Sequence, residues 1–207
     1  HAGGRMRPFD RFVLKRLFVQ VGGIIAIAVI LAVFLFSYNA TYNTVVTLDR
    51  QADERWAGIT HDLVERYRGI PALAAFLGPS LGPDTPALDQ VSADLSRWNA
   101  ALRDGGIGRL DPETANLEAS LGHLDRVLER HPDVLFTLEV LRFREGLDRS
   151  GAVIEDDRAA YNEAVRRYNE AIGSFPATLW SGNWGFLPRD FFTAELRERD
   201  AAPLPKA

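Results

Sequence analysis

The sequence predicts an all-α protein: a single N-terminal transmembrane helix, then an antiparallel (up-down-up-down) four-helix bundle with long first and last helices. Three observations support this class. Residues 17–36 form an uncharged apolar run, and apolar side chains recur every three or four residues along most of the remaining chain. Clusters of glycine and proline divide that remainder into segments of helical length. No stretch shows the strict apolar/polar alternation of a half-buried strand.

The run from Leu17 to Phe36 contains no charged residue and one amide, Gln20. With a rise of about 1.5 Å per residue, a helix of this length spans roughly 30 Å, the thickness of the bilayer's hydrocarbon core. A chain in lipid must satisfy its own backbone hydrogen bonds, so a helix is expected. The run is longer than the apolar part of a signal peptide, and Phe36-Ser37-Tyr38 lacks a small-x-small cleavage motif. We therefore expect residues 17–36 to be an uncleaved transmembrane anchor.

Charge is unevenly distributed around this anchor. Residues 1–16 hold five basic residues against Asp10, a net charge of +4, whereas the whole chain has a formal net charge of −4. The positive-inside rule then places residues 1–16 in the cytoplasm and residues 37–207 outside it. The remaining chain sums to −8, and an acidic domain argues against nucleic acid as the partner. The sequence has no cysteine, which excludes disulfides and thiolate chemistry.

The first bundle helix is predicted from about residue 41 to residue 77, continuous with the anchor, with a kink at Pro71. Gly78 to Pro83 is predicted to end it, and the second helix begins at Asp84 or Thr85 with Pro86 in its first turn. The glycine cluster at 105–108 ends the second helix. The third is predicted to open at Asp111-Pro112 and to end at His131-Pro132.

The fourth helix is predicted from residue 132 to about residue 173. Its second half has a heptad-like, coiled-coil seam: Leu147, Gly151, Ile154, Arg158, Tyr161, Val165, Tyr168 and Ile172. Arg158 is the polar member of the seam, so it either reaches solvent or pairs with a carboxylate, because an unpaired buried charge is costly. We expect Asp49 or Asp53 of the first helix, or Glu155 of its own helix, as the partner.

An aromatic C-terminal tail follows the fourth helix. Its large side chains are Trp180, Trp184, Phe186, Phe191 and Phe192. The fourth helix returns toward the membrane in an up-down-up-down path, so we expect this tail at the membrane-proximal end, covering what the shorter second and third helices leave bare. These side chains either complete the core or also contact lipid headgroups, as aromatic belts do.

Several motifs resemble the LemA family. Tyr161-Asn162-Glu163-Ala164 is repeated one heptad later as Tyr168-Asn169-Glu170-Ala171, and Phe175-Pro176, Gly185-Phe186 and Phe191-Phe192 follow. Trp56-Ala57-Gly58-Ile59 and the stretch from Arg66 to Leu73 resemble the family's first helix. Gly151-Ala152-Val153-Ile154 stands where the family often has Glu-Asn-Arg-Ile. The resemblance implies an anchored helical bundle of the bacterial cell envelope, in the plasma (inner) membrane, and it supplies no catalytic residue.

The sequence favours a membrane-anchored interaction or scaffold protein that binds a protein partner or a second copy of itself. The alternative is an extracytoplasmic ligand-sensing module that acts through a membrane partner. We expect no enzyme, because no catalytic motif is present. We expect no cofactor or metal, because His61 has only Glu65 and His123 has no further ligand at helical spacing, and a closed metal site needs several converging ligands. Asn162 and Asn169 either bond across helices or occupy exposed positions.

Overall fold

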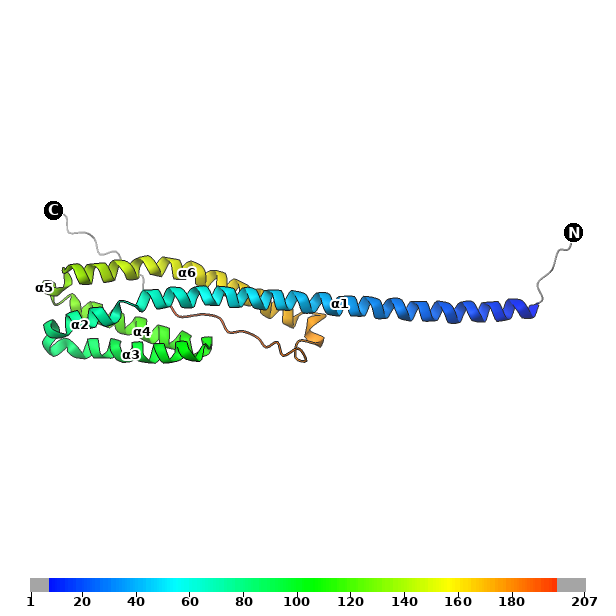
Figure 1. Ribbon diagram of the computed structural model, residues 1–207, viewed down its shortest axis with the longest axis horizontal. Coiled ribbons are helices and arrows are strands. Elements are labelled where there is room, and N and C mark those ends of the chain that lie inside the picture. Colours follow the sequence, from blue (N-terminus) through cyan, green and yellow to red (C-terminus); the bar gives the residue numbers. More distant parts are fainter. Residues whose placement is uncertain (1–7, 197–207) are drawn as a thin grey trace. The chain divides into compact units, whose positions relative to one another are not determined.

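The computed structural model describes residues 8–196, with side chains from residue 18 onward except at position 83 (Figure 1). Residues 1–7 of the predicted cytoplasmic segment and 197–207 of the predicted tail lie outside that range. The described chain is helical and contains no strand. Its elements are α1 (Pro8–Tyr67), α2 (Ile70–Leu81), the 3-10 turn η1 (Gly82–Asp84), α3 (Thr85–Asp104), α4 (Ile107–Leu128), α5 (Pro132–Leu135), α6 (Leu138–Gly173) and the 3-10 turn η2 (Ala177–Leu179).

The chain divides into two compact units. Among the described residues, the first unit comprises 8–47 and 171–187, and the second comprises 48–170 and 188–196. Both α1 and α6 therefore contribute to each unit. The apolar run 17–36 lies within α1, which Figure 1 shows as one continuous helix.

The second unit has an apolar core to which α1, α3, α4 and α6 all contribute. The seam predicted for α6 lies in it, with Ile154, Tyr161 and Val165 buried. Tyr67 of α1 meets Trp98 of α3 edge to face, with 5.0 Å between ring centroids, and Trp56 of α1 contacts Tyr161 of α6 at 5.4 Å. Burying each such large side chain stabilises the fold by about 1.5–3 kcal/mol.

The end of the first predicted helix is wrong by ten residues. The structure ends α1 at Tyr67, turns through Arg68 and Gly69, and starts α2 at Ile70 with Pro71 in its first turn. A proline lacks the N–H that the preceding turn would need, so the predicted kink becomes a complete break. In turn, α2 continues through the predicted break, past Pro79 to Leu81, because Leu77 and Leu81 are both buried on one helical face.

Two other predicted boundaries are also wrong. The third predicted helix begins as α4 at Ile107 rather than at Asp111, and Pro112 lies inside it. Gly105 ends α3 in a left-handed conformation with φ of 71°, which lets the chain restart at once and bury Leu110. The fourth predicted helix is divided into α5 and α6 by Phe136 and Thr137, and the Thr137 carbonyl accepts the Leu141 N–H in the new first turn.

Candidate functional site

The second unit includes an extended C-terminal segment, residues 188–196, that we call the strap. Asn169 of α6 pairs with the backbone of Arg189: its side-chain amide donates to the carbonyl and its Oδ1 accepts the N–H, both at 2.9 Å. Asn162 makes the same pair with Phe192, again at 2.9 Å for each bond. Both asparagines of the Tyr-Asn repeat therefore bind main chain, which is neither of the two alternatives expected from the sequence.

The spacing of the repeat explains why two asparagines fit one strap. Seven residues of helix rise about 10.5 Å, and three residues of extended chain span about 10 Å. The distance from Asn162 to Asn169 therefore matches the distance from Phe192 to Arg189. Since an asparagine amide offers a donor and an acceptor side by side, like a peptide group, each one can stand in for a neighbouring strand.

The tyrosines of the repeat hold the same segment. The Tyr161 hydroxyl donates to the Asp190 carbonyl at 3.0 Å, and the Arg189 guanidinium lies 5.5 Å from the centre of the Tyr168 ring. Burial raises the pKa of Tyr161 from its ordinary 10.0 to about 12. Both tyrosines are buried, so the repeat supplies core packing and strap contacts together.

Charged side chains fix the two ends of the strap. Arg189 forms ion pairs with Asp49 at 2.7 Å and Asp53 at 2.8 Å, both on α1. At the other end, the carboxylate of Asp111 on α4 accepts the backbone N–H groups of Thr193 and Ala194, each at 2.7 Å, and the Thr193 hydroxyl at 2.6 Å. The strap thereby connects α6 to α1 and α4.

Arg158 takes no part in this arrangement. It is half-buried and pairs with Glu155, three residues earlier on α6, at 2.5 Å. Asp49 and Asp53, its other expected partners, instead contact Arg189. Of the expected partners, Glu155 is therefore confirmed, and a carboxylate from the first helix is wrong.

The predicted aromatic tail is divided between the two units. Phe192 is fully buried in the second unit against Trp56, with ring centroids 5.7 Å apart, whereas Phe191 is exposed. In the first unit, an aromatic cluster forms between α1 and the tail. Its members are Phe34, Tyr38, Tyr42, Trp180, Trp184 and Phe186.

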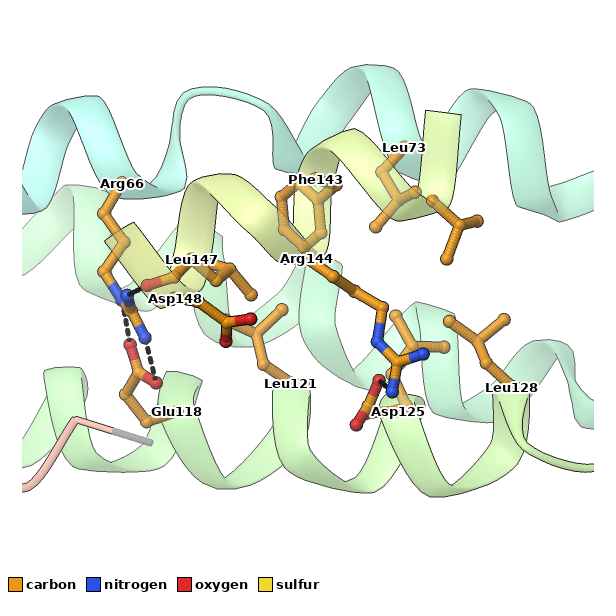
Figure 2. A pocket seen from close by; sticks show the side chains of 12 residues that line it. Arg66, Leu73, Glu118, Leu121, Asp125, Leu128, Phe143, Arg144, Leu147 and Asp148 are labelled. Carbon is orange, nitrogen blue, oxygen red and sulfur yellow. Dashed lines mark hydrogen bonds and ion pairs between the residues drawn. The ribbon is translucent and has the colours of Figure 1, made fainter. Parts of the chain in front are cut away.

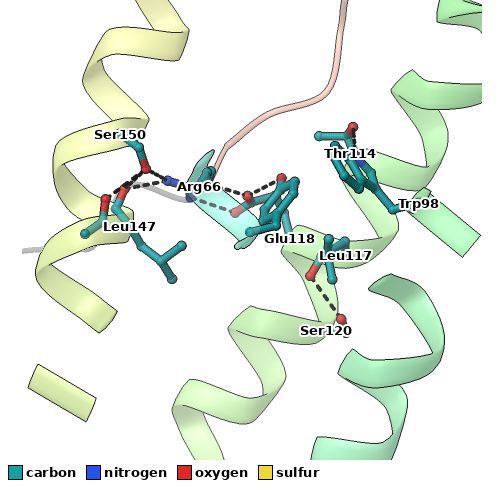
Figure 3. Close-up of polar contacts among 10 residues, drawn as sticks. Arg66, Trp98, Thr114, Leu117, Glu118, Ser120, Leu147 and Ser150 are labelled. Carbon is teal, nitrogen blue, oxygen red and sulfur yellow. Dashed lines mark hydrogen bonds and ion pairs between the residues drawn. The ribbon is translucent and has the colours of Figure 1, made fainter. Parts of the chain in front are cut away.

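A buried ion pair of the second unit was missed by sequence reasoning. Arg66 of α1, with no exposed side-chain surface, forms a bidentate pair with Glu118 of α4 at 2.7 and 3.0 Å (Figure 3). Tyr67 donates to the same carboxylate at 2.6 Å, and Ser150 accepts from Arg66 at 2.9 Å. Burial, followed by the Glu118 charge, raises the pKa of Tyr67 well above its ordinary value. The spacing could have indicated this burial. Arg66 is seven residues from both Ile59 and Leu73, so it shares their heptad position, and both of these residues are buried.

A small cavity adjoins this network (Figure 2). Its walls are mostly apolar, with side chains such as Leu73, Leu121 and Phe143, and its volume is about 40 Å³. The Arg66–Glu118 pair and a second pair, Arg144–Asp125 at 2.9 Å, both line it. A water needs about 10–15 Å³ by this measure, so the cavity has room for a few waters. Within residues 8–196, no group of three or more histidine or acidic side chains converges as a metal site would require.

These features define a class of protein: an all-helical chain that carries a long apolar N-terminal helix and holds a C-terminal strap against its last helix. Of the helices described, α1 alone is long and apolar enough to cross a membrane; its most apolar stretch has a mean hydropathy of 2.7 and no buried residue. The chain belongs to the LemA family, whose family model matches residues 55–204. No curated protein matches it. The matched region includes both the Tyr-Asn repeat and the strap.

Proposed function

We propose that this LemA-family chain is a membrane-anchored interaction protein without a catalytic step. Residues 17–36 anchor it in the bacterial plasma membrane, and the helical domain lies outside the cytoplasm, where it binds a protein partner or a second copy of itself. Two observations support the anchoring. The large side chains of the apolar run from Phe18 to Phe36 are exposed, and the basic residues precede the run.

The domain that the anchor holds is, in this proposal, an antiparallel four-helix bundle of α1, α3, α4 and α6. Support comes from the ring contact between Tyr67 and Trp98 and from the ion pairs that join α1 and α6 to α4. The two-residue connection between α3 and α4, Gly105-Gly106, is of the length that joins antiparallel neighbours. A rigid bundle of this kind suits the presentation of a surface better than the enclosure of a substrate.

The observation that carries the proposal is a group of exposed apolar side chains where α5 meets α6. Phe136 is 71 % exposed, Leu138 is 55 % exposed and Leu141 is 42 % exposed. We call these three residues the junction patch. Isolated apolar side chains are common on protein surfaces, but several together mark interaction sites. An exposed phenylalanine beside leucines is also the kind of anchor that buries well in a partner's pocket.

Site-specific photo-crosslinking tests this proposal. A photoreactive amino acid replaces Phe136 in the full chain in its native membrane, and two differently tagged copies are co-expressed to distinguish self-association from a different partner. We expect a discrete crosslinked product whose yield falls severalfold when Leu138→Ser is added. The control places the same probe at Asn116, an exposed polar position on α4. Equal products from positions 116 and 136, or none from 136, would contradict an interaction role for the junction patch.

A second candidate function is ligand sensing through a membrane partner. Its supporting observation is an open groove of about 630 Å³ between α1 and α6, lined by Arg68, Arg142 and Arg149 together with Asp62 and Glu65. Its excess of arginines suits small anions. A thermal-shift series with inorganic phosphate and small carboxylates tests it. An upward shift that Arg142→Gln abolishes would favour sensing, and a flat series would leave the interaction role as the better account.

A further inference from the structure

The first unit contains a second uncharged stretch besides the anchor. Residues 171–187 include no Asp, Glu, Lys, Arg or His, although charged residues make up 25 % of the whole chain. On α1, no charged residue occurs from residue 17 to residue 48. The first charges met on leaving these stretches are Asp49, Glu170 and Arg189, and the boundaries of the first unit lie within two residues of them. Beyond residue 16, the first unit is therefore free of formal charge.

The two uncharged stretches are joined by aromatic contacts. Trp180 meets Phe34 and Tyr38 edge to face, with ring centroids 5.4 and 5.2 Å apart. Trp184 contacts Tyr38 and Tyr42 at 5.1 and 5.3 Å, and its indole N–H donates to the Tyr38 hydroxyl at 2.6 Å. Phe34, Tyr38 and Tyr42 are four residues apart and share one face of α1. Because Phe34 belongs to the apolar run, the tail packs against the last turn of that run.

Other apolar side chains of this stretch point away from the chain. Phe175 is 80 % exposed, Leu179 is 58 % exposed and Leu187 is 72 % exposed, and all three lie in the same uncharged segment as the two tryptophans. Several exposed large apolar side chains in one short segment are unfavourable in water and indicate an interaction surface. The segment contacts the apolar run where Trp180 meets Phe34, a side chain that is itself 49 % exposed, so a lipid layer around the end of the anchor can cover these side chains as well.

We infer that residues 175–187 lie in the bilayer interface, so that the aromatic cluster is a lipid-binding surface on one face of the end of the anchor. This inference rests on the anchoring proposed above. Phe34 is two residues from the end of the apolar run, about 3 Å along the helix axis, and Tyr42 is about 12 Å further along from Phe34. The headgroup layer of each leaflet is about 5–8 Å thick. The cluster thus extends from the edge of the hydrocarbon core through the headgroups, the zone that tryptophan and tyrosine favour.

Tryptophan fluorescence in vesicles tests the inference. The full chain is reconstituted into phosphatidylcholine vesicles that contain lipid brominated either near the carbonyl end or deep in the acyl chains. The chain has four tryptophans, of which Trp98 is buried and Trp56 is half-buried in the second unit. We expect quenching, stronger with the shallow bromines, and its loss when Trp180→Phe and Trp184→Phe are combined. Phenylalanine keeps the ring contacts, so the first unit should keep its structure.

A gain-of-signal variant guards against a folding artefact. Adding Phe175→Trp to the double variant should restore quenching, because Phe175 is 80 % exposed. Flotation of the vesicles distinguishes failure of the anchoring from failure of the interfacial position of residues 175–187. Protein that fails to float contradicts the anchoring. Protein that floats but shows no quenching, in the wild type or in the Phe175→Trp variant, overturns the inference alone. Absence of quenching together with crosslinking between two copies at position 175 would assign this surface to a second copy.

Discussion

Asn162 and Asn169 show how single side chains replace a strand. Each makes two hydrogen bonds of 2.9 Å with one residue of the strap, so four bonds hold a segment that has no ladder partner of its own. Phe192, which one of them binds, is fully buried, and its backbone groups have no access to water once it is packed. The asparagines therefore satisfy polar groups that the core would otherwise leave unpaired.

Replacing Asn162 should destabilise the domain. Asn162→Ala leaves the buried N–H and carbonyl of Phe192 without partners, which costs about 1–3 kcal/mol. Urea unfolding followed by circular dichroism measures the loss. Asn116→Ala is the matched control, because Asn116 is exposed and on α4. If the two variants unfold at the same urea concentration, the amide pairs do not stabilise the strap.

Arg66 should be the most sensitive charged position of the domain. Arg66→Ala removes the guanidinium from beside the Glu118 carboxylate, which is only 4 % exposed. Removing one member of a buried ion pair typically costs about 3–5 kcal/mol. The double variant Arg66→Met with Glu118→Leu removes both charges and should be more stable than Arg66→Ala. A single variant that unfolds like wild type in urea would show that the pair is not buried in solution.

Tyr161 should give the domain an alkaline limit. Its pKa rises from 10.0 to about 12 on folding because it is buried. A group whose pKa is raised in the folded state leaves stability complete below the unfolded value, and stability declines as the pH passes from about 10 to about 12. Tyr161→Phe should flatten part of that decline, which urea titrations at pH 9 and 11 would reveal as a smaller difference in midpoint. An unchanged difference would contradict the burial of this hydroxyl.

Among the elements, the strap depends on α4 as well as on α6. Asp111 accepts three hydrogen bonds from Thr193 and Ala194, so its carboxylate fixes the far end of the strap. Asp111→Ala should increase amide hydrogen exchange of strap peptides severalfold without increasing that of α3. Asp89→Ala, an exposed position on α3, is the control. Equal exchange of the strap in both variants would mean that the asparagines alone hold it.

Helix type was predictable from the sequence, whereas several helix ends were not. The spacing of apolar residues correctly predicts the helical stretches, and Thr85 with Pro86 correctly marks the start of α3. Pro79 and Pro112, read as boundaries, lie inside helices because buried leucines on either side continue the packed face. Tertiary packing there outweighs local preference, a balance that a single sequence does not display.

Of the contact between α6 and the strap, only the α6 half was predictable from the sequence. The Tyr-Asn repeat is visible as a motif, but the strap has no periodicity, since its backbone rather than its side chains is what Asn162 and Asn169 bind. Arg66 was overlooked because arginine is rarely buried unless paired, and Glu118, its partner, is 52 positions later in the chain. Pairings at such separation become visible only in three dimensions.

For the whole molecule, the proposed topology is a chain anchored by α1 with its helical domain outside the cytoplasm. The absence of cysteine makes single-cysteine labelling direct. Ser96→Cys places a thiol at an exposed position on α3, and Gly4→Cys places one before the anchor. A membrane-impermeant maleimide is added to intact spheroplasts and, separately, to lysed ones. We expect Ser96→Cys to be labelled in intact spheroplasts and Gly4→Cys only after lysis. Labelling of Gly4→Cys but not Ser96→Cys in intact spheroplasts would contradict this topology.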